Sequence, residues 1–88
     1  GASPACSVAN VRKFPGGLLE AHFDIRQGRI CGLKIFGDYF FQRPTEEFCA
    51  RLEGCPYERE KIAGRLSEVA TGEYFSGISP EELLSLFI

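Results

Sequence analysis

The chain shows no recognisable grouping of the side chains that enzymes use for proton transfer or nucleophilic attack. His22 is the only histidine, and it alternates with Glu20 and Asp24 along one stretch. A single histidine with no partner at a recognisable spacing is typical of a solvated strand residue rather than of a general base or a metal ligand. The sequence therefore predicts no catalytic residue and no metal ligand in this chain.

Four cysteines are scattered through the sequence, at positions 6, 31, 49 and 55. Zinc sites favour close pairs such as C-x-x-C, and no such pair is present. We expect these cysteines to be reduced structural thiols in the cytoplasm, with no disulfide framework. Metal or persulfide chemistry is the alternative interpretation.

The stretch GDYFF at residues 37–41 is the candidate contact site. Asp38 can cap the turn that follows or face a ligand, and turn chemistry is the expected role. Tyr39, Phe40 and Phe41 cannot all point inward if the segment is extended, so some of them are expected to form an exposed patch. No glycine pattern typical of phosphate binding accompanies them.

Composition indicates an ordinary folded domain. The 88 residues are 44% hydrophobic and 25% charged, with a net charge of −2 and the two signs interspersed. This balance predicts no nucleic-acid partner, and no apolar run approaches the roughly 18 residues of a membrane span. We expect residues 1–10, which carry no visible signal peptide, to be a linker or arm and residues 11–88 to be one domain.

A β-hairpin is predicted for residues 17–41, because apolar residues alternate on both sides of the break at Arg26-Gln27-Gly28. A two-residue turn mixes the apolar and polar faces. We therefore expect a three-residue loop with Gly28 in the left-handed conformation and Glu20 opposite Lys34. The pairs predicted by this register are Phe23 with Cys31, Ala21 with Leu33, and Leu19 with Ile35.

A short third strand at residues 11–14 can extend the hairpin, which would be marginal on its own. Helices are expected at residues 46–53, capped by Thr45, and at residues 57–70. Gly64 within the second helix suggests close packing against another element. A capping box from Ser79 to Glu82, with proline between them, predicts a last helix. The predicted fold is α+β, a small antiparallel sheet (hairpin plus possible third strand) covered by about three helices.

The order of these pieces resembles the small C-terminal accessory domain of bacterial lipoate–protein ligases. The resemblance extends over about residues 3–70, and Tyr39 stands where that family usually has phenylalanine. It is carried by Lys13-Phe14, Gly17, residues 19–25, Gly28, residues 35–40, Leu52-Glu53-Gly54 and Tyr57-Glu58.

The resemblance implies a non-catalytic accessory domain, either excised from a larger chain or a separate small subunit. It would support ATP-dependent activation of lipoate and transfer of the lipoyl group to lysines of acceptor proteins. Lipoate, ATP and magnesium would act in the complete enzyme, with no cofactor bound by this chain. Its partners would be the catalytic domain and lipoyl-acceptor domains. Asp38, Tyr39 and Phe40 are then the expected docking residues.

Two alternatives remain at the level of sequence. The first is an iron–sulfur or sulfur-transfer scaffold of related fold, although Phe36 stands where such scaffolds usually place a cysteine. The second is a protein-interaction module with no link to lipoate.

Overall fold

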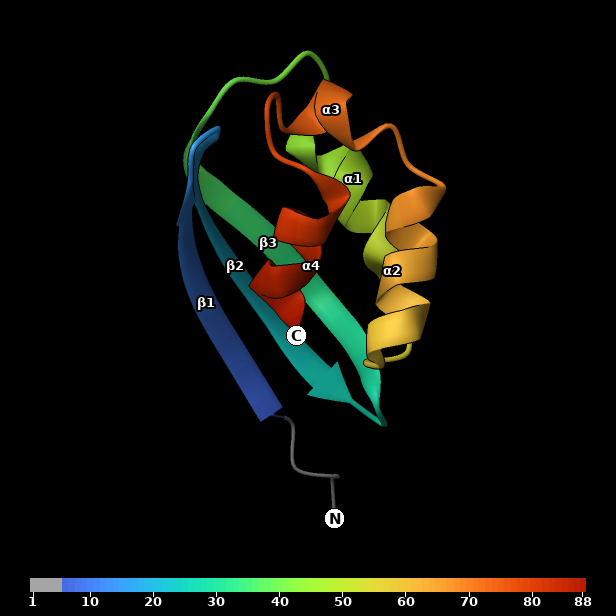
Figure 1. The fold of residues 1–88 in the computed structure, drawn as a ribbon. Helices are drawn as coiled ribbons and strands as arrows, with labels where there is room; N and C mark the ends of the chain where they lie inside the picture. Colours follow the sequence, from blue (N-terminus) through green and yellow to red (C-terminus); the bar gives the residue numbers. More distant parts are fainter. Residues whose placement is uncertain (1–5) are drawn as a thin grey trace.

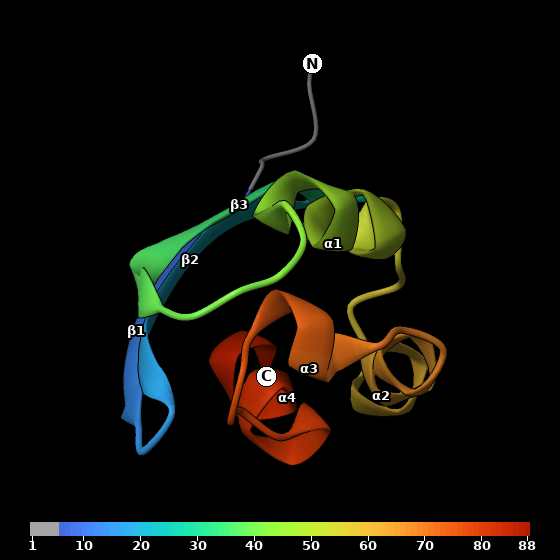
Figure 2. The same ribbon diagram turned by 90° about the horizontal axis from the view of Figure 1, so that it is seen from above.

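A three-stranded antiparallel sheet forms one layer of the molecule, and helices cover one of its faces (Figures 1 and 2). The computed structural model describes residues 6–88, and the strands lie in the order β1-β2-β3. The α+β fold is confirmed. The elements are β1 (Cys6–Phe14), β2 (Gly17–Arg26), β3 (Arg29–Tyr39), α1 (Thr45–Leu52), α2 (Arg59–Ser67), α3 (Thr71–Tyr74) and α4 (Pro80–Phe87).

The predicted register of the hairpin is wrong. The turn has two residues, Gln27 and Gly28, both at positive φ (51° and 73°), a geometry whose twist matches that of the flanking strands. A bulge at Gly32, with φ of 67°, then sets two residues of β3 opposite Phe23. The observed pairs include Ala21 with Ile35, Glu20 with Phe36, His22 with Lys34, and Asp24 with Cys31.

The bulge is the physical reason for this error. A two-residue turn alone would place apolar and polar residues on one face, and the extra residue in β3 shifts the alternation by one position. Ile30, Leu33 and Ile35 therefore all reach the buried face, while Cys31 takes the position opposite Asp24. The apolar faces come together as expected, through a different set of partners.

Strand β1 is longer than predicted, because it begins at Cys6 and pairs with β2 along its whole length. Residues 6–10 of the predicted arm are thus part of the sheet, and residues 1–5 lie outside the described residues. Val8 packs against the core, and the Asn10 amide donates a hydrogen bond of 2.9 Å to the Leu86 carbonyl in α4. These contacts come from residues far along the chain, which explains why local composition suggested an arm.

The helices differ from the predicted ones mainly at their ends. Helix α1 begins at Thr45 and has no side-chain cap, since Pro44 occupies the N-cap position. Within residues 57–70 the helix α2 is shorter than expected, and a four-residue helix that was not predicted, α3, follows it. The capping box between Ser79 and Glu82 is confirmed, with hydrogen bonds of 2.9 and 3.1 Å.

The core lies between the sheet and the helices. Leu19, Ala21 and Phe23 of β2 are buried in it, together with side chains from the helices. The largest fully buried side chains include Phe48 of α1, Phe75 after α3 and Phe87 of α4. None of the four helices in residues 6–88 has the length and apolar content that a bilayer crossing requires.

Candidate docking site

Two phenylalanines protrude where β3 ends and the chain turns toward α1, in the green loop at the top of Figure 1. Phe40 is 81% exposed and Phe41 is 60% exposed, the largest values among the exposed large hydrophobic residues. Asp38, just before them, is also exposed. We call residues Asp38, Tyr39, Phe40 and Phe41 the aromatic tip.

Main-chain hydrogen bonds hold the aromatic tip in place. The Ser76 N–H donates to the Phe40 carbonyl at 2.9 Å, while the N–H groups of Gln42 and Arg43 both donate to the Glu73 carbonyl at 2.8 and 3.2 Å. The exposed ring of Phe40 therefore projects from a backbone that is attached to the end of α3. A backbone held in this way loses little conformational entropy when a partner binds.

Arg43 adds a second attachment. Its guanidinium lies 3.0 Å from the Glu47 carboxylate and 3.4 Å from that of Glu73, and its carbon is 5.2 Å from the centre of the Tyr74 ring. The hydrogen bonds to Glu73 and Glu47 raise the pKa of Arg43 above its ordinary value. These contacts tie the loop after the aromatic tip to both α1 and α3.

Tyr39 faces the opposite way from Phe40. Its hydroxyl is 2.5 Å from the Thr45 hydroxyl, and its ring centre is 5.0 Å from that of Phe75 in the core. Phe41 packs against it, with ring centres 5.9 Å apart. Tyr39 is therefore half-buried and anchors the tip, and Thr45 is occupied by this contact instead of capping α1.

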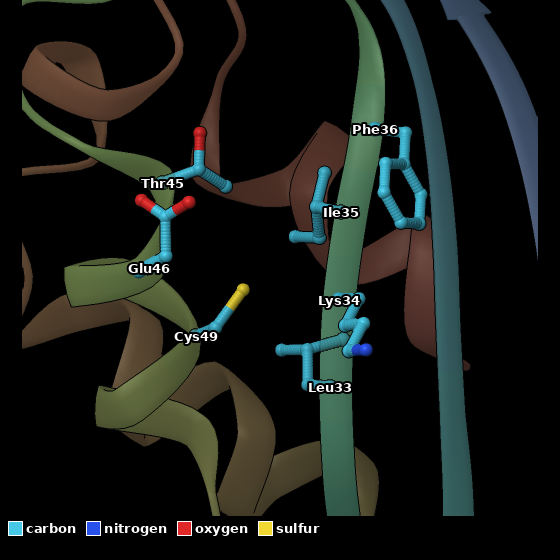
Figure 3. A pocket seen from close by; sticks show the side chains of 7 residues that line it. All are labelled: Leu33, Lys34, Ile35, Phe36, Thr45, Glu46 and Cys49. Atoms are coloured by element: carbon cyan, nitrogen blue, oxygen red, sulfur yellow. The ribbon is translucent and has the colours of Figure 1, made fainter.

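A shallow pocket of about 190 Å³ lies between β3 and α1 (Figure 3). Its lining includes Ile35 of β3 and Thr45, Glu46 and Cys49 of α1. The Cys49 side chain points from α1 toward β3, and burial raises the pKa of its thiol to about 11, only partly offset by a hydrogen bond from the Ile35 backbone. The thiol is thus protonated near neutral pH and is a poor nucleophile.

The remaining reactive side chains do not converge on a reaction centre. His22 forms a 2.5 Å contact with Glu20 on the exposed sheet face. A hydrogen bond with Glu53 is the main cause of a raised pKa at Cys31, and desolvation raises that of the buried Cys55. Within residues 6–88, no group of three His, Cys, Asp or Glu side chains is arranged to hold a metal ion.

The structure separates the three predicted docking residues. Asp38 and Phe40 lie at the surface, whereas Tyr39 packs inward. Sequence reasoning missed Phe36, which is 54% exposed and lies on the same side of β3 as Asp38. The signal was available, because Phe36, Asp38 and Phe40 are spaced by two residues and Ile35 belongs to the apolar face.

Comparison with known proteins places these features in context. The family model for the C-terminus of bacterial lipoate protein ligases matches residues 3–87. The chain is similar to lipoate-protein ligase LplJ of Bacillus subtilis (strain 168), with 35% identity over 98% of this chain and 26% of the relative. Lipoate–protein ligase 1 of Staphylococcus aureus (strain Mu50) is 34% identical, with the same shares covered.

A third relative is the lipoate–protein ligase of Streptococcus pyogenes serotype M5. It is 32% identical over 81% of this chain and 21% of the relative. The chain thus spans about a quarter of the length of the curated relatives that it matches.

Proposed function

Because the chain belongs to the family of C-terminal domains of bacterial lipoate–protein ligases, we propose that it acts as a non-catalytic accessory domain that docks on the catalytic portion of such a ligase. In this proposal, residues 11–88, together with the strand residues 6–10, form one accessory domain in the cytoplasm. It supports ATP-dependent adenylation of lipoate and transfer of the lipoyl group to lysines of acceptor proteins. Docking covers the active site during adenylation, and movement away admits the acceptor domain.

Phe40 carries this proposal. An aromatic ring that is 81% exposed costs free energy in water unless a partner covers it, and the backbone beneath it is fixed by hydrogen bonds to the end of α3. Aromatic residues that are exposed on a rigid support are typical anchors of protein interfaces. The relatives contain a further three quarters of sequence, which supplies a partner of suitable size.

The chemistry of the complete enzyme has no visible counterpart in this domain. Within residues 6–88, no three acidic, histidine or cysteine side chains come together to hold a metal ion. The pocket beside Cys49 offers a single carboxylate, that of Glu46. From the family membership, we assign lipoate, ATP and magnesium to the catalytic portion, and we derive no reaction step in this chain.

Binding in solution tests the proposal. The partner is LplJ truncated before the region that this chain matches, and the dissociation constant is measured by titration calorimetry. Phe40→Ser is expected to weaken binding by about tenfold or more, because truncation of an interface anchor costs roughly 2 kcal/mol. Tyr39→Ala is unsuitable, since it removes packing on Phe75 as well as surface.

Ile88→Ser is the matched control. Ile88 is also an exposed hydrophobic residue, but it lies at the C-terminus, away from the aromatic tip (Figure 1). The control should bind like the unaltered chain. Equal binding by the Phe40 variant and the unaltered chain, or no binding by either, would contradict the proposal.

A further inference from the structure

We propose that the uncovered face of the sheet is part of the surface that docks on the catalytic portion of the ligase, an inference that rests on the proposed function. This outer face points away from all the helices (Figure 2). Three apolar residues, one from each strand, surround Glu20 on this face. The outer patch, as we call it, consists of Val11, Leu18 and Phe36.

Three large apolar side chains stand among the polar residues of this face. An antiparallel sheet with one covered face normally alternates apolar residues inward and polar residues outward. Here Val11, Leu18 and Phe36 occupy outward positions and are 50%, 40% and 54% exposed. Each neighbours an inward residue, such as Leu19 beside Leu18 and Ile35 beside Phe36, so the alternation itself places them outside.

The register brings the three side chains together. Val11 and Phe36 are the partners of Glu20 on its two sides, and Leu18 is two residues before Glu20 on the same face. Diagonal neighbours in a sheet lie roughly 7–8 Å apart, which is within reach of large side chains. The outer patch is therefore one cluster and not three isolated residues.

The charge at its centre is already paired. The Glu20 carboxylate lies 2.5 Å from the His22 ring nitrogen, and the His22 ring packs edge-on against Phe36 with centres 5.7 Å apart. Along β2, His22 lies on the side of Glu20 that is away from Leu18. A partner that covers Leu18 and Phe36 thus meets a carboxylate that already has a hydrogen-bonding neighbour, which lowers the cost of removing water.

The outer patch continues into the aromatic tip. Phe36 and Asp38 share the outer side of β3, and Asp38 is the partner of Leu18 in the register. Phe40 follows two residues later. A partner seated on Phe40 would therefore extend over the outer patch without crossing a covered region of the surface.

The size of the face favours a linked domain over a second copy of this chain. The sheet is nine residues long at β1 and three strands wide, so its outer face has an area on the order of 400 Å². Two copies would bury about 800 Å² in total, less than the roughly 1,200 Å² of stable complexes. A catalytic portion seated on this face also covers Phe40 of the aromatic tip, so it buries more than the face alone, and interfaces between domains begin at about 600 Å². This chain spans about a quarter of the relatives, and the remaining three quarters include the catalytic portion. The catalytic portion is therefore the partner that we propose for this face.

Titration of variants into the same truncated LplJ tests the inference. The double variant Leu18→Ser/Phe36→Ser is expected to raise the dissociation constant by about tenfold or more. Phe36→Leu, which keeps an apolar side chain, and the Ile88→Ser control should stay within about threefold of the unaltered chain. Thermal unfolding of each variant verifies that it is folded at the temperature of the titration.

Footprinting supplies a readout that needs no substitution. Radical labelling of Phe36 in the unaltered chain should fall severalfold when truncated LplJ is added. Unchanged labelling, or tight binding by the double variant while Phe40→Ser binds weakly, would overturn the inference and leave the proposed function standing. Failure of the unaltered chain to bind would overturn both. Self-association of this chain at micromolar concentration, abolished by the double variant, would assign the face to a second copy and overturn the inference.

Discussion

At the scale of single residues, burial decides what the thiols can do. Cys49 lies beside β3 in the pocket of Figure 3, where the loss of water around the thiol raises its pKa from an ordinary 9.0 to about 11. Such a shift keeps the protonated form, which neither attacks electrophiles nor binds metals well. The prediction of a structural thiol at this position agrees with the packing around it.

Alkylation measures this effect directly. At pH 7.5 the thiolate fraction of Cys49 should be about 100-fold lower than that of an ordinary cysteine, while the higher basicity of its thiolate returns nearly tenfold in reactivity. We expect iodoacetamide to modify Cys49 about tenfold more slowly in the folded chain than in denaturant, as resolved by peptide mass spectrometry. The rate should rise with pH up to about 11. Equal rates in the folded and unfolded chain would contradict the assigned burial.

At the scale of elements, the sequence predicted correctly those features that depend on residues close together in the chain. The capping box of α4 depends on Ser79 and Glu82 alone, so it was predictable and is confirmed. The hairpin register depends on which glycine forms a bulge, and Gly32 could be recognised only once its position opposite Phe23 was known. Likewise, the inward orientation of Tyr39 comes from contacts with Thr45 and Phe75, which sequence order does not reveal.

Gly64 in α2 is another position whose packing the sequence did not reveal, and it gives a prediction for this helix. Close packing was expected there, but a methyl group added at Gly64 meets no other atom within 4 Å. Gly64→Ala is therefore expected to stabilise the domain by about 0.5–1 kcal/mol, since alanine is the better helix former. Urea unfolding measures the change, with the exposed α4 substitution Ser85→Ala as a comparison in another helix. A destabilised Gly64 variant would indicate the close packing that the structure lacks.

At the scale of the whole molecule, the two faces of the sheet differ in what covers them. Helices cover one face of the sheet and bury the core, while the other face and the aromatic tip expose apolar side chains among polar ones. The chain belongs to the ligase family, and the relatives are about four times as long as this chain. We therefore interpret both surfaces as docking surfaces for the remaining part of the ligase. The central claim that we propose is that this domain contributes to lipoyl transfer by docking, while the reaction centre lies in the catalytic portion of the ligase.

One assay of ATP-dependent lipoyl transfer to an acceptor domain tests that claim most directly. It compares this chain alone, truncated LplJ alone, and the two mixed at increasing concentrations of this chain. The account predicts no turnover by this chain, a rate for the mixture that exceeds that of truncated LplJ and saturates, and a half-saturating concentration about tenfold higher for Phe40→Ser. Turnover of lipoate and ATP by the isolated chain, or a rate that its addition leaves unchanged, would contradict the account.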